Sequence, residues 1–284
     1  MISIARRNLK IFFRDRTAVF FSLLGVIIII GLYVLFLGDM MLKGLSDIEN
    51  ARFLMDSWIM AGMLAATSIT TTMGAFGVMV DDRSNKALKD FSSSPLRRSS
   101  LTGGYILSSF AIGVVMSIVA FIFAEIYIIA YGGKILPFIA IIKVFGCILL
   151  SVLASSAMVY FIVSFFKSQS AFATASTVIG TLIGFLTGIY IPVGSLPGAV
   201  QMIVKVFPVS HAGSLFRQIM MESPIKESFG GAQADVVLDF KNSFGVVFSF
   251  GNHTVTWIEN IIVLVATVVI FYGLSILNLS RKSK

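Results

Sequence analysis

Six long apolar runs, nearly free of charged residues, occupy more than half of this chain. A helix of ~20 residues spans the ~30 Å of hydrocarbon in a bilayer, and each run is about that long. In lipid every backbone N–H and C=O must be paired within its own segment, and the alternation typical of barrel strands is absent. The sequence therefore predicts an all-α membrane protein with six transmembrane helices, forming a single domain over residues 1–284. The runs cover residues 18–37, 58–80, 104–131, 138–166, 171–191 and 257–279.

Positive charge is concentrated in the segments that share one side of this topology. If both termini are cytoplasmic, the inner segments hold 14 of the 22 Lys and Arg residues but only four of the 14 Asp and Glu residues. Cytoplasmic loops of membrane proteins carry such an excess of Lys and Arg. We therefore expect a multi-pass protein of the cell membrane with both termini in the cytoplasm. Because the basic residues flank spans, their expected partners are membrane lipids with anionic headgroups, and no nucleic acid is expected.

The composition argues against several other classes of protein. With 57% hydrophobic and 13% charged residues, the chain has too few polar side chains to cover a water-soluble surface. Its one cysteine, Cys147, lies in an apolar run, and His211 and His253 are far apart, so we expect neither disulfides nor a metal site. The sequence contains no Gly-x-x-x-x-Gly-Lys-Ser/Thr loop and no hydrolase or metalloprotease motif. We therefore expect a chain that holds no cofactor and is not an enzyme.

Residues 1–17 form a basic segment in front of the first run. Ile2, Leu9 and Phe13 recur at helical spacing, while Arg6 and Lys10 lie on another face. This pattern predicts an amphipathic helix in the plane of the inner interface, with a disordered basic anchor as the alternative. The run that follows is too long for a signal peptide and lacks a small-residue cleavage site, so we expect the segment to be retained.

Residues 81–103, between the second and third runs, combine eight charges with an apolar pair and a proline. Leu88 and Phe91 lie three residues apart, and Pro95 would end a helix that contains them. We interpret the segment as a cytoplasmic coupling loop with a short helix that docks on a soluble partner; the alternative is a solvated loop whose charges only set topology. The candidate contact residues are Asp82, Arg83, Lys86, Leu88, Lys89, Asp90, Phe91, Pro95, Arg97 and Arg98.

Residues 192–221 are too apolar for an open loop, yet prolines interrupt them. These prolines prevent one continuous spanning helix, so we predict two short helices that enter the outer leaflet and return. A kinked seventh span is the alternative, but it would put the carboxyl terminus outside and break the charge asymmetry. The re-entrant segment is a candidate outer gate, with Pro192, Leu196, Pro197 and Pro208 as its residues. Residues 222–256 are expected to be extracellular, as a small cap or a linker.

Two stretches of the sequence resemble a known family. Asp82-Arg83, followed by Leu-Lys-Asp-Phe at 88–91 and Ser-Pro-Leu-Arg-Arg at 94–98, is similar to the cytoplasmic loop of type-2 ATP-binding-cassette exporter permeases. Residues 188–198, followed by Phe-Pro-Val-Ser-His at 207–211 and by Arg217, are similar to the re-entrant segment of that family. The order of spans also matches throughout the chain. The resemblance implies a permease subunit whose ATP and Mg²⁺ are held by a separate ATP-binding-cassette ATPase subunit.

The second and fifth runs carry candidates for a transport path and for helix packing. On the second run, Thr67, Thr70, Thr71 and Gly74 share one face. Their hydroxyls can bond their own helix or border a hydrated path, and the resemblance favours the path. On the fifth run, Gly180, Gly184 and Gly188 have the spacing that lets two helices approach closely, within the chain or between subunits. The resemblance places the first and fifth spans near the axis between two permease halves and implies a homo- or heterodimer.

We therefore expect an ATP-driven exporter that moves an amphipathic or lipid-like substrate, such as a drug, peptide or toxin, out of the cell. The apolar spans favour this class over a polysaccharide or glycolipid, which is the alternative within the family. An ion-coupled carrier would place several ionisable residues near the midplane, and only Glu125 comes close. An intramembrane enzyme would need a nucleophile facing a base, and no such pair is evident.

Overall fold

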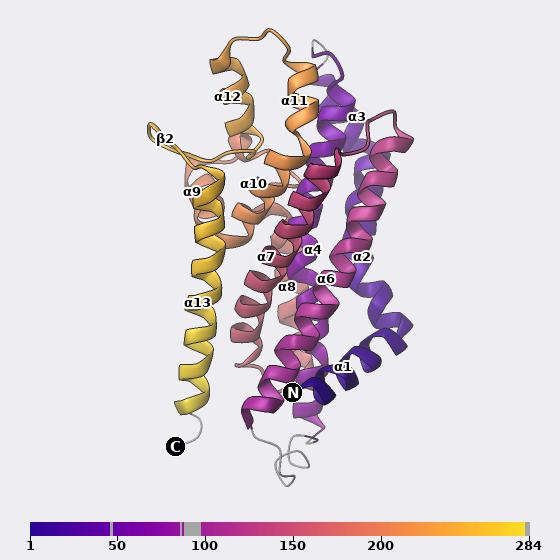
Figure 1. The fold of residues 1–284 in the computed structure, drawn as a ribbon, viewed down its shortest axis with the longest axis vertical. Helices are drawn as coiled ribbons and strands as arrows, with labels where there is room; N and C mark the ends of the chain where they lie inside the picture. Colours follow the sequence, from indigo (N-terminus) through magenta and orange to yellow (C-terminus); the bar gives the residue numbers. More distant parts are fainter. Residues whose placement is uncertain (46–47, 86, 88–97, 282–284) are drawn as a thin grey trace.

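The computed structural model describes the chain except for residues 46–47, 86, 88–97 and 282–284. Among the described residues, six helices are long and apolar enough to cross a membrane, which confirms the predicted number of spans. They form a bundle whose long axes run in roughly the same direction (Figure 1). The six spans are Arg16–Leu35, Ala51–Ser84, Ser99–Ala130, Phe138–Val163, Gln169–Leu186 and Trp257–Asn278.

The chain begins with the predicted amphipathic helix, α1 (Ile2–Arg14). Its buried face packs against α6 (Arg98–Ala130), and Figure 1 shows it oblique to the long helices, at the bundle end where the last helix, α13 (Trp257–Arg281), also finishes. Asp15 then turns the chain into α2 (Arg16–Leu32). Its Oδ1 accepts hydrogen bonds from the backbone N–H groups of Thr17 and Ala18, both at 3.0 Å, which satisfies two of the unpaired donors at the start of α2.

Helix α4 (Ala51–Ser84) is the centre of the bundle. In its most apolar window 83% of residues are buried, against 17% in α8 (Gln169–Leu186). The neighbours of α4 include α2, α6, α8, α7 (Phe138–Val163) and α10 (Pro208–Met220). The hydroxyls at positions 67–72 of α4 fit this position because they bond their own helix; Thr71 Oγ1, for example, donates to the Thr67 carbonyl at 2.7 Å. The outer helices leave much apolar surface exposed, as expected where lipid covers them.

The end of the bundle opposite α1 is built from shorter elements (Figure 1). After α2 the chain continues through a π-helical turn, η1 (Tyr33–Leu37), and α3 (Gly38–Lys43). After α8 come a 3₁₀ turn, η2 (Val193–Ser195), and two helices, α9 (Gly198–Val206) and α10 (Pro208–Met220). Phe207 between them is extended, as a residue before proline prefers, and the two helices meet at 83°. This bent pair agrees with the predicted re-entrant segment.

Residues 222–256 form folded structure next to the bent pair. They contain α11 (Glu222–Ser228), α12 (Ala234–Ser243) and a hairpin of β1 (Ser249–Phe250) and β2 (His253–Thr254). The strands are antiparallel, with Ser249 opposite Thr254. Of the two interpretations of this segment, cap or linker, its secondary structure favours the cap. The chain then enters the last span, α13 (Trp257–Arg281).

Candidate functional site

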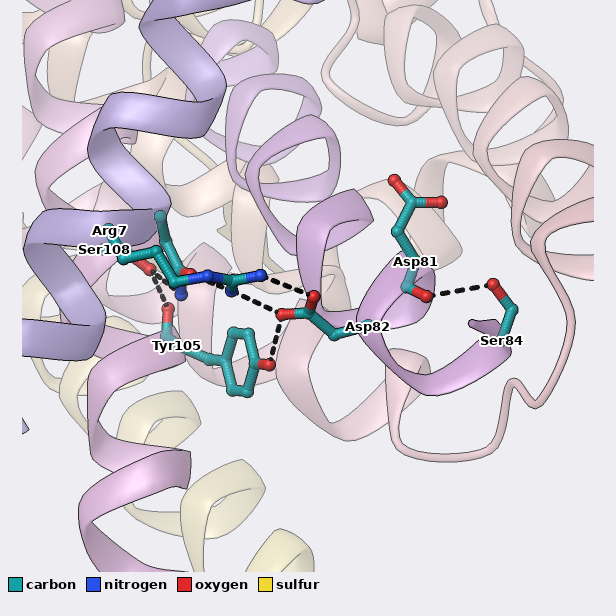
Figure 2. Close-up of polar contacts among 7 residues, drawn as sticks. Arg7, Asp81, Asp82, Ser84, Tyr105 and Ser108 are labelled. Atoms are coloured by element: carbon teal, nitrogen blue, oxygen red, sulfur yellow. Dashed lines mark hydrogen bonds and ion pairs between the residues drawn. The ribbon is translucent and has the colours of Figure 1, made fainter. Parts of the chain in front are cut away.

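An ion pair joins α1 to the last turn of α4. Arg7 Nη1 and Nη2 donate to the two carboxylate oxygens of Asp82 at 2.7 and 2.8 Å, and the Tyr105 hydroxyl of α6 donates to the same carboxylate at 2.6 Å (Figure 2). This two-pronged geometry is the strongest that a carboxylate offers to arginine. The bonded carboxylate raises the pKa of Arg7 above its ordinary value. Beside the pair, Asn8 donates to Ser108 at 3.2 Å, so a small polar cluster fixes three helices at one point.

The next residue, Arg83, reaches the opposite side of α4. Its Nη1 donates to the backbone carbonyls of Phe166 at 2.6 Å and Val163 at 3.3 Å, where α7 ends. The last carbonyls of a helix lack partners within it and carry partial negative charge, so a guanidinium stabilises them. Asp82 and Arg83 therefore connect the last turn of α4 to α1 and α6 on one side and to α7 on the other.

These two residues are the part of the predicted coupling set whose side chains the structure places. Because α4 extends to Ser84 and α6 starts at Arg98, both edges of segment 81–103 are helical. The short amphipathic helix predicted between these edges lies among residues that the structure does not describe. The other candidate contact residues also lie outside the described part of the chain: Lys86, Leu88, Lys89, Asp90, Phe91, Pro95, Arg97 and the side chain of Arg98.

A cavity of about 960 Å³ lies between α1, α2, α4 and α8. Thr70 and Gly74, two of the four predicted path residues, line it. Thr67 and Thr71 are instead fully buried in the bundle, with their hydroxyls bonded to carbonyls of α4. The rest of the wall is mostly apolar, with aromatic rings from α1, α2 and α8. This volume lies at the upper end of the ~300–1,000 Å³ typical of small-molecule sites.

The cavity also has hydroxyl side chains on α8 that sequence reasoning missed. Ser176, Thr177 and Thr181 line it beside Gly180. Each of the three hydroxyls donates to a carbonyl of α8 itself, which lets them face an apolar environment. Their signal in the sequence is the clustering of small polar residues in the fifth run, the same signal that identified the second run.

The three glycines of the fifth apolar run, two in α8 and one just after it, have different surroundings. Gly180 faces the cavity, with no heavy atom within 4 Å of the place a Cβ would take. At Gly184 a Cβ would overlap the ring of Tyr190. Gly188 has φ +64°, a conformation that favours glycine, and it ends the helix. Within the chain, Gly184 and Gly188 thus shape the turn after α8, while the role of the glycines in packing two subunits stays a prediction.

The residues of the predicted outer gate lie at the breaks between the short elements. Leu196 packs against an apolar cluster that includes Val204 and Phe248. Each proline stands at or directly before the start of an element: Pro192 before η2, Pro197 before α9 and Pro208 at the first position of α10. A missing N–H is harmless there, because the first donors of a helix have no partner within it.

Arg217 of α10 is a functional candidate to which the sequence assigned no role. Its side chain is fully buried, and Nη2 donates to the carbonyls of Thr187 and Gly188, both at 3.0 Å, at the end of α8. The guanidinium also lies 5.0 Å from the ring centre of Trp58, whose Nε1 donates to the Phe244 carbonyl at 2.7 Å. No carboxylate pairs with Arg217 in the described part of the chain. A lone arginine among apolar residues and prolines is the available sequence signal.

Glu125 lies close to the end of α6 rather than halfway along the span. Its Oε2 accepts a hydrogen bond from the backbone N–H of Leu136 at 3.1 Å, across the turn to α7. The side chain is 9% exposed. The placement gives Glu125 a structural task, closing the α6–α7 turn.

Comparison with known proteins adds a family to this geometry. A family model described as "ABC-2 family transporter protein" matches residues 48–277. A stretch of 78 residues is 32% identical to nodulation protein J of Rhizobium meliloti (strain 1021) and covers 28% of this chain. The same stretch spans 30% of nodulation protein J, so this likeness is partial.

Proposed function

The chain belongs to the ABC-2 family of transporter proteins, and from this premise we propose that it exports an amphipathic or lipid-like substrate, powered by a separate ATPase subunit. Membership makes it the membrane subunit of an ABC transporter, which associates with an ATP-binding subunit. The observation that carries the proposal is the cavity between α2, α4 and α8. Its apolar and aromatic wall with scattered hydroxyls suits a molecule that is mostly apolar and has a few polar groups.

The last turn of α4 is the proposed input for the energy of ATP hydrolysis. It directly precedes the segment whose sequence resembles a coupling loop. Its Asp82 binds α1 and α6, and its Arg83 binds the end of α7. If closing ATPase subunits displaced the last turn of α4, these hydrogen bonds would move α1, α4, α6 and α7 together. Two permease halves would then rock against each other and open the cavity to the outside.

The bent pair α9–α10 is the proposed outer gate. The 83° bend and the prolines keep these helices short, so they close the end of the bundle instead of crossing it. Arg217 ties the pair to the end of α8, the helix that contributes much of the cavity wall. A displacement of α8 would therefore reach the gate through directional hydrogen bonds.

Copurification tests the proposal. We expect the tagged chain to bring down an ATP-binding-cassette ATPase, and transport to stop when the phosphate-loop lysine of that ATPase is replaced. Reversing the charge of Arg97 and Arg98 should weaken the association. Lys143→Glu with Lys241→Glu serves as the matched control, because Lys143 lies near the start of α7 and Lys241 lies in α12, at the bundle end opposite α1. If the ATPase binds equally well to all three proteins and transport is unchanged, the coupling assignment is wrong.

A further inference from the structure

The cavity between α2, α4 and α8 has an uneven distribution of charge. Two carboxylates, Asp15 and Asp81, line it, whereas no Lys or Arg does so among the residues that the structure describes. One lies at the junction of α1 and α2, and the other lies in the last turn of α4. The charged side chains of the described cavity wall are therefore both carboxylates.

Both carboxylates have free binding capacity. Asp15 uses Oδ1 for the two backbone N–H groups of α2, and its Oδ2 forms no hydrogen bond or ion pair with the described residues. Asp81 is exposed, and Figure 2 shows its carboxylate pointing away from the Arg7–Asp82 pair. Its backbone carbonyl accepts hydrogen bonds from the Ser84 hydroxyl at 3.1 Å and from the Asn85 N–H at 2.9 Å, whereas its carboxylate forms no ion pair with the described residues. The described arginines next to Asp81 are engaged elsewhere, since Arg7 binds Asp82 and Arg83 binds the carbonyls at the end of α7.

The rest of the wall suits the apolar body of a cation. Aromatic rings of Phe12, Phe21, Phe172 and Tyr190 line the cavity. Their faces attract cations and offer a large apolar area. An anion of the same shape would gain the apolar contacts but would meet two carboxylates, with no Lys or Arg in the described wall to compensate them.

We infer that the cavity takes amphipathic cations, holding the apolar body between α2, α4 and α8 and the positive group at Asp15 and Asp81. The inference rests on the proposed function, since it names the substrate class of the same cavity. A coulombic contact in a hydrated cavity is worth about fivefold in affinity per carboxylate, so the two together contribute on the order of 25-fold.

Three probes of similar shape separate charge from size: tetraphenylphosphonium, neutral triphenylphosphine oxide and anionic tetraphenylborate. The full chain, in phosphatidylcholine nanodiscs, carries Cys147→Ser and Thr177→Cys, so that a maleimide reports on the cavity wall. We expect phosphonium to protect the new thiol at lower concentration than the oxide does. Asp15→Asn with Asp81→Asn should raise the protecting phosphonium concentration ~25-fold, leave that of the oxide unchanged and lower that of the borate. Asn can still accept the two N–H groups of α2, so the turn is preserved.

The control is Asp39→Asn with Asp235→Asn, which removes the same charge from exposed positions outside the cavity wall. The inference is overturned if the double variant at 15 and 81 binds phosphonium as the parent does, if the oxide weakens equally, or if the control has the same effect. Copurification of the ATPase is measured on the same proteins. If the ATPase still copurifies but the cavity shows no preference for the phosphonium, only the cation inference is overturned. If the cavity prefers the phosphonium but the chain neither binds an ATPase nor supports ATP-dependent transport, only the proposed function is overturned.

Discussion

Replacing Arg7 by methionine removes the ion pair that holds α1 against α4 while keeping an unbranched apolar stem. The variant loses two charge-assisted hydrogen bonds, of 2.7 and 2.8 Å, to the carboxylate of Asp82, whose side chain is 8% exposed. Each such bond is worth about 1.5–3 kcal/mol. The Arg7 side chain is 37% exposed, so solvent screens part of this energy, and Tyr105 still donates to Asp82. We therefore expect the docking of α1 to weaken by about 2 kcal/mol, roughly 30-fold in equilibrium constant.

Hydrogen–deuterium exchange of the full chain in nanodiscs measures this docking directly. The amides of α1 should exchange about 30-fold faster in the variant, while those in the centre of α4 keep their protection. Arg6→Met is the matched control, because Arg6 is exposed and has no ion pair among the described residues. When Asp82 is already replaced by asparagine, Arg7→Met should speed the exchange of the α1 amides much less than it does in the parent protein. The reasoning fails if Arg6→Met speeds α1 exchange equally, or if Arg7→Met has the same effect on α1 exchange with Asp82 present and with Asp82→Asn.

Further substitutions test the bundle end opposite α1 and its turns. Arg217→Lys should destabilise the chain by about 2–3 kcal/mol in thermal unfolding, since an ammonium group cannot make two carbonyl bonds and also stack on Trp58; an unchanged midpoint would contradict this. Gly188→Ala should cost at least about 1 kcal/mol and more than Gly231→Ala, which also has positive φ but open space around it. Glu125→Gln should keep a midpoint close to that of the parent, because its amide oxygen can accept the same backbone N–H, whereas Glu125→Leu should lower stability by about 1–2 kcal/mol.

The spans were predictable because a bilayer demands long apolar helices, but their ends were not. The second helix begins at Ala51, seven residues before the predicted run, since Arg52 and Asp56 lie one turn apart and 3.7 Å from each other. An ion pair one turn apart lets charged residues lie inside a helix, whereas a boundary drawn from hydropathy alone excludes them. The fifth helix ends at Leu186 instead of continuing to 191, because Gly188 takes a left-handed conformation. Local pairing and backbone geometry decide these ends, and an apolar pattern reports neither.

The candidate site was predictable only in part, for a related reason. Helical spacing puts Thr67, Thr70, Thr71 and Gly74 on one face, yet only Thr70 and Gly74 line the cavity. Burial depends on which helices pack around α4, and spacing along one helix does not contain that information. The Arg7–Asp82 pair joins residues 75 positions apart, and one sequence gives no means of matching such distant partners. The prolines of the bent pair were readable because each acts on its own backbone.

The polar contacts of this bundle suggest which parts move as units during transport. At one end, charged hydrogen bonds join α1, α4, α6 and α7; at the other, Arg217 joins α10 to the end of α8. In the cavity wall between them, the hydroxyls of Thr70, Thr177 and Thr181 each donate to a carbonyl of their own helix. Directional bonds to charged groups are costly to break, whereas apolar contacts re-form when helices slide. We therefore expect each end to move nearly as a rigid group, and the cavity wall to change shape when the last turn of α4 is displaced.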